Sequence, residues 1–282
     1  MKIAVVGGNG FIGKEFCRYA SECGHTAIVI GSDCDAFSEN GEKRIKAILA
    51  ECNSMVFLAA RRPTSFFSMQ DYIYNITLAD RYLQFAEETL IEDVVITSSR
   101  SVYSSINTPW KEEDFQIPLS LYGASKQAID ALALWHNANK GMKIKCLRLA
   151  QVIGIGERKG FLLNTLIDNA IMGKKQTIYG KGIGRRQYIY VRDVCDVILH
   201  CLETKKDKTG IFNIGMKDNM SIIELTKMIN EVFGNEAGIE MLEDKPEDTK
   251  EYLMDTTKAE RELHWTPSYS LKATFEDIKK HA

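Results

Sequence analysis

Apolar residues in the first half of the chain form short continuous runs, separated by longer stretches in which they recur with helical spacing. A continuous apolar run is typical of a strand covered on both faces, as in a parallel sheet between helices. We predict five such strands, at 2–6, 26–30, 55–59, 94–98 and 144–149. Helices are predicted between them at 11–23, 42–51, 71–88 and 121–137. This alternation indicates an α/β fold with a doubly wound parallel sheet.

The pattern changes after Leu149, where the elements become shorter and less regular. Ser221 and Glu224 form a capping box, which predicts the start of a helix that runs to Phe233. The other predictions are a loop at 154–160, helices at 161–172, 256–263 and 271–280, and strands at 177–179 and 187–190. We therefore predict a sheet domain from residues 1–152, with 187–215 returning to it. Residues 153–186 and 216–282 are predicted to form a smaller α/β substrate-binding lobe.

The first predicted strand leads directly into a glycine-rich turn, Gly7-Gly8-Asn9-Gly10-Phe11-Ile12-Gly13, which opens a predicted helix. The spacing of Gly8, Gly10 and Gly13 fits the dinucleotide-binding fingerprint, in which glycines allow a tight turn and close backbone approach to a pyrophosphate. The helix N-terminus also offers free N–H groups to the phosphates. We predict a Rossmann-type sheet that binds a dinucleotide, and the alternative is a glycine-rich turn before an ordinary helix. The residues predicted to contact the cofactor here are Gly7, Gly10, Phe11, Ile12 and Gly13.

The residues after the second predicted strand bear on which dinucleotide is used. In NAD-binding proteins an acidic residue about 20 residues after the glycines accepts hydrogen bonds from the ribose. Here the strand ends in Gly31-Ser32-Asp33, so glycine occupies the expected carboxylate position. We expect NADP, because nothing there repels a 2′-phosphate and Ser32 can donate a hydrogen bond to it. NAD is the alternative, since Asp33 can still reach the ribose. The polar stretch 32–42 also predicts that one strand is missing or vestigial.

A tyrosine and a lysine lie one helical turn apart in Tyr122-Gly123-Ala124-Ser125-Lys126. Positions i and i+4 share one face of a helix, and a neighbouring ammonium favours the ionised form of a phenol. A tyrosine placed in this way can transfer a proton to or from a carbonyl or alcohol oxygen, typically worth about 10²–10⁴-fold in rate. The preceding strand ends in a serine-rich segment, at the edge where such sheets bind ligands. We predict catalysis by Ser99, Tyr122 and Lys126, with Ser98 and Ser101 as alternative hydroxyl donors.

With these motifs the chain resembles, nearly from end to end, the extended short-chain dehydrogenase/reductases of the nucleotide-sugar epimerase/dehydratase family. Gly7, Gly10 and Gly13 match the family's cofactor turn, and Ser99, Tyr122 and Lys126 match its catalytic triad. Further cofactor contacts that the resemblance implies are Leu58, Ala59, Ala60, Arg62, Asn75, Tyr122, Lys126 and Leu149, beside Ser32. The substrate contacts predicted on this basis are Ser99, Ser101, Tyr122 and Arg186. A planar guanidinium suits the diphosphate of a nucleotide-linked sugar, which is the role expected for Arg186.

Two of the family's reactions are disfavoured by the residues present. The 4,6-dehydratases place an Asp-Glu pair after their active-site Thr, whereas Thr97 is followed by Ser98 and Ser99. Members that epimerise beside a ketone use a Cys two residues after the catalytic Ser, where this chain has Ser101. We therefore expect neither dehydration nor C3/C5 epimerisation.

Three functions remain open. We expect a 4-ketoreductase, in which NADPH reduces the C4 keto group of a nucleotide-linked sugar while Tyr122 protonates the oxygen and Ser99 polarises the carbonyl. The alternative is a nucleotide-sugar 4-epimerase, similar to UDP-glucose 4-epimerase, that retains NAD. The third is a non-catalytic module that senses NADP, which the presence of both Tyr122 and Lys126 disfavours.

Composition adds the remaining expectations. The 282 residues are 45% hydrophobic and 26% charged with a net charge of −2, which gives no reason to expect binding to nucleic acid or membranes. The seven cysteines show no metal-binding spacing, so no metal site is expected. We expect a cytoplasmic protein, because no signal peptide or membrane-spanning apolar run is apparent. Members of the family often dimerise through the helix that carries Tyr122, which here continues through Ile129, Leu132, Leu134 and Trp135, so a homodimer is expected.

Overall fold

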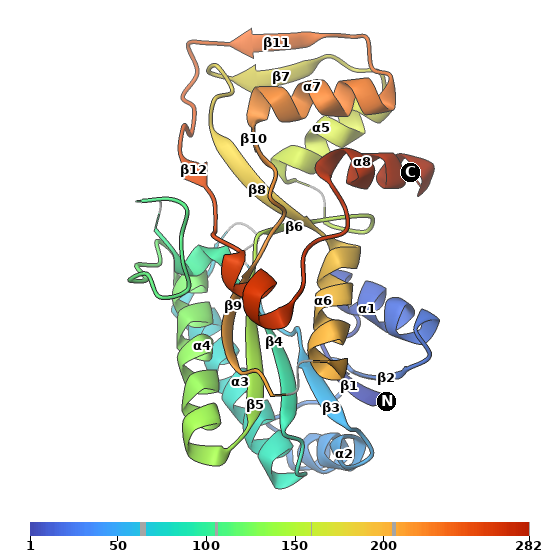
Figure 1. The fold of residues 1–282 in the computed structure, drawn as a ribbon, viewed down its shortest axis with the longest axis vertical. Coiled ribbons are helices and arrows are strands. Elements are labelled where there is room, and N and C mark those ends of the chain that lie inside the picture. The colour runs from blue at the N-terminus through green and yellow to red at the C-terminus, as the bar shows by residue number, and fades with distance from the viewer. Residues whose placement is uncertain (63–65, 105–106, 159, 205–206, 282) are drawn as a thin grey trace.

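The computed structural model describes residues 1–62, 66–104, 107–158, 160–204 and 207–281. Its main sheet has six strands in the order β2-β1-β3-β4-β5-β9, and all neighbouring strands are parallel (Figure 1). The strands are β1 (Lys2–Val6), β2 (Thr26–Ile30), β3 (Ser54–Phe57), β4 (Asp93–Ser99), β5 (Lys143–Leu149) and β9 (Gly210–Ile214). The predicted α/β fold with a Rossmann-type parallel sheet is confirmed. The third strand ends two residues before its predicted end at residue 59.

Helices cover both faces of this sheet. The helices α1 (Phe11–Glu22) and α6 (Val191–Glu203) pack together on one face, whereas α2 (Glu39–Ala50), α3 (Met69–Glu88) and α4 (Leu121–Lys140) cover the other (Figure 1). In β1, Ile3 and Val5 belong to the first core, and Ala4 and Val6 belong to the second. Both sets of side chains are buried, which is why the strands read as continuous apolar runs. None of the helices in the described ranges is both long and apolar enough to cross a membrane.

The segment between β2 and β3 contains no strand, as predicted; all of its residues are described. The chain turns through a loop into α2, whose N-cap Ser38 accepts a hydrogen bond from the Gly41 N–H at 3.1 Å. The helix therefore begins three residues before its predicted start at residue 42. Without this strand, β2 forms the edge of the sheet.

The remaining elements form a second group, drawn at the top of Figure 1. The strand β8 (Arg185–Tyr190) pairs with β6 (Gln151–Ile153), β10 (Asn219–Ser221) and β12 (Glu251–Tyr252), and β7 (Gln176–Tyr179) pairs with β11 (Ile239–Leu242). Beside them lie α5 (Leu162–Ile171), α7 (Ile222–Phe233) and α8 (Leu271–His281). The capping box of Ser221 and Glu224 is confirmed. The helix predicted at 256–263 is replaced mainly by a π-helical segment, Ala259–Leu263.

The predicted division into a sheet domain and a lobe stays a prediction. Of the segment 187–215, β9 joins the main sheet and α6 covers it, whereas β8 pairs only with strands of the second group. Residues 205 and 206 of this segment, and residue 159 of the predicted loop 154–160, lie outside the described residues.

Candidate active site

A cavity of about 710 Å³ opens along the carboxyl ends of the central strands. Its lining runs from the turn between β1 and α1, past the ends of β2 and β3, to the end of β4 and the start of α4. This edge is where ligands bind in doubly wound sheets. Every predicted site residue except Asn75 and Arg186 lines this one cavity. The set comprises Gly7, Gly10, Phe11, Ile12, Gly13, Ser32, Leu58, Ala59, Ala60, Arg62, Ser99, Ser101, Tyr122, Lys126 and Leu149.

The glycine turn brings backbone segments together too closely for side chains. Gly7 has a φ of +83°, and a Cβ added to it would lie 2.9 Å from the Ala59 nitrogen. A Cβ at Gly13 would lie 2.4 Å from the Gly7 oxygen. The helix α1 therefore begins directly against β1, and no side chain caps its N–H groups at the N-cap Gly10. An uncapped helix N-terminus beside a cavity offers donors to an anion. These residues fit the pyrophosphate of a dinucleotide.

The loop after β2 carries an acidic residue that the sequence analysis missed. The predicted cofactor residue Ser32 lines the cavity together with Gly31 and Asp35. Asp33 is not part of the lining, and its carboxylate pairs with Arg44 at 3.1 Å between Oδ2 and Nη2. The fingerprint counts residues along a strand, whereas this chain turns at Gly31 and brings a later carboxylate to the cavity. A carboxylate therefore does lie at the end of the cavity where the adenosine ribose is expected.

The three predicted catalytic residues line the cavity where β4 ends and α4 begins, Ser99 in β4 and Tyr122 and Lys126 in α4. The N-cap Ser120 starts α4 by accepting a hydrogen bond from the Gly123 N–H at 3.1 Å. Lys126 is only 3% exposed, and its Nζ donates to the Thr97 carbonyl at 2.8 Å. The same Nζ lies 6.0 Å from the centre of the Tyr122 ring. This arrangement brings a buried positive charge close to the phenol.

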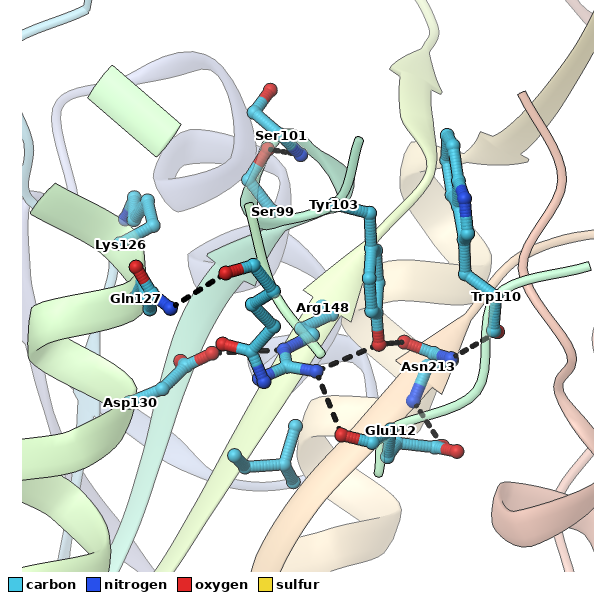
Figure 2. Close-up of polar contacts among 12 residues, drawn as sticks. Ser99, Ser101, Tyr103, Trp110, Glu112, Lys126, Gln127, Asp130, Arg148 and Asn213 are labelled. Carbon is cyan, nitrogen blue, oxygen red and sulfur yellow. Dashed lines mark hydrogen bonds and ion pairs between the residues drawn. The ribbon is translucent and has the colours of Figure 1, made fainter. Parts of the chain in front are cut away.

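The serine side of this junction comes from the short 3₁₀ helix η1 (Arg100–Val102), which directly follows β4. Ser99 Oγ accepts a hydrogen bond from the Ser101 N–H at 3.1 Å, and Figure 2 shows these two residues next to each other. A Cβ at Gly123 would lie 2.0 Å from the Ser101 carbonyl oxygen, so glycine at this position lets α4 start against η1. Because Ser99 Oγ acts only as an acceptor in this bond, its proton can point to a ligand.

Next to the cavity, a buried polar network joins α4, β5 and β9 (Figure 2). Arg148 is fully buried, and its Nε donates to Asp130 Oδ2 at 2.9 Å while Nη1 donates to the Tyr103 hydroxyl at 2.7 Å. That hydroxyl donates to Asn213 Oδ1 at 2.8 Å. The backbone N–H of Asn213 in turn donates to Glu112 Oε1 at 2.7 Å. Within the described part of the chain, Nη2 is the one nitrogen of the Arg148 guanidinium that has no hydrogen-bond partner. A charged residue within an apolar strand was the sequence signal for this network.

Asn75 and Arg186 are the predicted site residues that do not line the cavity. Asn75 is buried, and its side-chain amide bonds both backbone groups of Arg61, donating to the carbonyl at 3.0 Å and accepting from the N–H at 2.8 Å. Asn75 therefore supports a segment that does line the cavity. Arg186 donates to Asp248 Oδ2 at 2.9 Å and to the Lys250 carbonyl at 2.8 Å. The role of Arg186 on a diphosphate stays a prediction.

Besides Asp35, four charged residues that the sequence analysis did not assign line the cavity: Arg61, Arg100, Glu157 and Arg158. Burial raises the pKa of Glu157 to about 7, although the positive charge of Arg62 opposes this shift. Burial also lowers the pKa of the Arg100 guanidinium. The sequence signal that could have identified Arg100 is its position between Ser99 and Ser101, directly after a strand.

Comparison with known proteins extends the similarity over the whole chain. A model of the NAD dependent epimerase/dehydratase family matches residues 3–215. The UDP-glucose 4-epimerase of Halalkalibacterium halodurans is 25% identical, over 100% of this chain and 94% of that protein. The crystal structure of a UDP-N-acetylglucosamine 4-epimerase from Bacillus cereus is 26% identical, with a TM-score of 0.89 over 100% of this chain and 96% of that one. A Bacillus cereus UDP-glucuronic acid 4-epimerase, solved with UDP-glucuronic acid and NAD, is 26% identical, with a TM-score of 0.83 over 100% of this chain and 98% of that one.

Proposed function

Because this chain belongs to the NAD dependent epimerase/dehydratase family, we propose that it is a nucleotide-sugar 4-epimerase that retains bound NAD. The observation that carries the proposal is the single cavity that joins the glycine turn to Ser99, Tyr122 and Lys126. Hydride transfer at a sugar carbon needs a dinucleotide site and a proton-transferring group in one enclosed space. The full-length similarity to 4-epimerases supports C4 as the reacting carbon.

In this proposal the bound dinucleotide would supply hydride transfer, and the side chains transfer the proton and bind the sugar oxygen. Tyr122 takes the proton of the C4 hydroxyl when the sugar is oxidised and returns it when the sugar is reduced. Ser99 donates a hydrogen bond to the same oxygen. Lys126, whose Nζ lies 6.0 Å from the centre of the Tyr122 ring, binds the ribose next to the nicotinamide. The other predicted cofactor contacts that line the cavity hold the dinucleotide along it.

A 4-ketoreductase that uses NADPH is the second candidate, and it is favoured by Gly31 and Ser32 in the cavity lining. Asp35 in the same part of the lining favours NAD, because a carboxylate accepts hydrogen bonds from ribose hydroxyls and repels a 2′-phosphate. Among the described residues, the carboxylates of the lining are Asp35 and Glu157, and neither comes from the end of β4. This supports a reaction other than dehydration, which needs an acid and a base beside the catalytic hydroxyl.

The identity of the dinucleotide in freshly purified protein, measured by mass spectrometry after denaturation, tests the proposal. The protein is then incubated with UDP-glucose, UDP-N-acetylglucosamine and UDP-glucuronic acid, and the products are identified by NMR. Near-stoichiometric NAD together with a C4 epimer supports the epimerase. Cofactor-free protein that consumes NADPH with a 4-keto nucleotide sugar supports the ketoreductase instead. Protein with neither dinucleotide binding nor turnover contradicts both enzymes.

We also propose that the protein forms a homodimer through α3 and α4. These helices pack side by side and expose large apolar side chains, with Met69 52%, Ile73 52%, Leu134 44% and Trp135 50% exposed. Ile129 and Leu132, expected to belong to the dimer helix surface, instead pack into the core of the chain. Light scattering at micromolar concentration is expected to give a dimer for the wild type and a monomer for Trp135→Glu. A monomeric wild type would contradict this assembly.

A further inference from the structure

Arg100 lines the cavity directly beside Ser99, and among the described residues Asp248 acts on its guanidinium only from beyond ion-pair distance. Its Nη1 is completely buried and has no hydrogen-bond partner. No ion pair or side-chain hydrogen bond joins Arg100 to any described carboxylate. Burying an unpaired charge costs several kcal/mol, so buried cations normally have a partner. An anion bound in the cavity would be such a partner.

The aromatic ring of Tyr252 contacts two arginines that have different environments. The Cζ atom of Arg100 lies 4.7 Å from the centre of this ring, and the Cζ of Arg186 lies 4.5 Å from it. The guanidinium of Arg186 is committed to Asp248 and to backbone carbonyls. Arg100 contacts the ring but forms no ion pair with a described residue, and a cation–π contact is weaker than a buried, hydrogen-bonded ion pair. Of these two cations, Arg100 is therefore the one available to a ligand.

The position of Arg100 also defines where its ligand must lie. Arg100 shares the cavity with Ser99, Ser101 and Tyr122, so a group bound to it is close to the proposed reacting sugar. A guanidinium binds the two oxygens of a carboxylate or a phosphate through parallel hydrogen bonds. A nucleotide sugar can present either group, as its diphosphate or as a carboxylate on the sugar.

We propose that Arg100 is a specificity-determining residue that binds an oxyanion of the substrate beside the reacting sugar. The inference rests on the proposed function in taking a nucleotide sugar as the occupant of the cavity. It goes beyond the sequence-based expectation, in which Arg186 holds the diphosphate. The oxyanion comes from the diphosphate or from a sugar carboxylate, and ligands that carry one or both groups distinguish these sources.

The test compares dissociation constants of UDP, UDP-glucose and UDP-glucuronic acid, measured by isothermal titration calorimetry on protein saturated with NAD. The variants are Arg100→Gln, which removes the charge, and Arg100→Lys, which keeps the charge but loses the bidentate geometry. Arg261→Gln is the matched control, because Arg261 is 71% exposed, pairs with Glu262 and does not line the cavity. Arg100→Gln is expected to weaken binding about 10- to 100-fold, with a smaller loss for Arg100→Lys and none for the control.

The pattern of losses identifies the source of the oxyanion. An equal loss for all three ligands supports the diphosphate, and a loss restricted to UDP-glucuronic acid supports the carboxylate. Affinities within about twofold of wild type for all three ligands would overturn the proposal. Melting temperatures of the ligand-free variants give a second readout, because a purely structural arginine predicts a lower melting temperature with unchanged affinity. If Arg100→Gln does not fold, the affinities of Arg100→Lys for the same three ligands test the proposal, with the same pattern of losses supporting or overturning it.

Failure of the proposed function is recognised separately, as a wild-type protein that binds none of the three ligands. The oxyanion site is then tested with inorganic pyrophosphate on NAD-saturated protein. A rise in the melting temperature of the wild type that is lost in Arg100→Gln supports the site. Equal shifts in both proteins, or no shift in either, would overturn it.

Discussion

Arg148 in β5 and Arg100 at the end of β4 carry the same functional group in two different environments. Arg148 is surrounded by groups from the chain itself, with Asp130 as its carboxylate partner and the Tyr103 hydroxyl as an acceptor. Arg100 faces the cavity and has no such carboxylate among the described residues. A buried cation whose partner belongs to the protein acts in packing, whereas one without such a partner is available for a ligand.

Among the residues that line the cavity, the largest effect on activity is expected from the replacement Tyr122→Phe. Removing the phenol hydroxyl removes the proton-transferring group, so turnover of the nucleotide sugar is expected to fall about 10²–10⁴-fold. The urea unfolding midpoint is expected to stay close to that of the wild type, since no described hydrogen bond within the protein is lost. Coupled assays of C4 epimerisation and urea titrations measure the two effects. Wild-type turnover in this variant would exclude Tyr122 as the catalytic acid–base.

Asp130→Ala, in the buried network around Arg148, is expected to have the opposite result, a large loss of stability. Its removal leaves the buried Arg148 charge without a carboxylate, which typically costs about 3–5 kcal/mol of stability. The double replacement Asp130→Leu with Arg148→Met is expected to recover most of this loss, because no unpaired charge remains. Urea unfolding followed by circular dichroism, at one fixed NAD concentration, gives the free energies. A double variant less stable than Asp130→Ala would contradict this account.

A smaller, pH-dependent effect is expected from Glu157, which lines the cavity near Arg62. Its pKa of about 7 means that the carboxyl is neutral below this pH and negatively charged above it. A negative charge in the cavity opposes the phosphates of the dinucleotide, so NAD affinity is expected to fall by roughly fivefold from pH 6 to pH 8. Fluorescence titrations measure this dependence, and Glu157→Gln is expected to abolish it. An unchanged pH profile in the variant would exclude Glu157 as its origin.

The same carboxyl also affects stability, with a sign that follows from its raised pKa. The folded protein holds the proton of Glu157 up to a pH of about 7, whereas the unfolded chain releases it near the ordinary value of 4.5. Ionisation therefore opposes folding, and the difference in stability between wild type and Glu157→Gln is expected to shift against the wild type as the pH rises between these values. Thermal unfolding scans at several pH values measure this difference.

The elements that sequence analysis predicted correctly depend on interactions close together in the chain. Both faces of β1 are buried, so the strand appears as a continuous apolar run and can be predicted without knowing which helices cover it. The capping box of Ser221 and Glu224 acts within a single helical turn. The turn from Gly7 to Gly13 and the spacing of Tyr122 and Lys126 are similarly local. The start of α2 was missed because Ser38, rather than the apolar pattern, sets where the helix begins.

The sequence by itself determined the α/β fold class, the glycine turn and the shared helix face of Tyr122 and Lys126, because backbone sterics and helical geometry act over a few residues. Only the tertiary structure decided which charged groups form ion pairs within the protein and which line the cavity without one. Arg186 finds Asp248, which is 62 residues away, and Asp33 finds Arg44 across a loop, so Asp35 and Arg100 are left to the cavity. Charges pair through space, and that pairing depends on loop paths that no local pattern encodes.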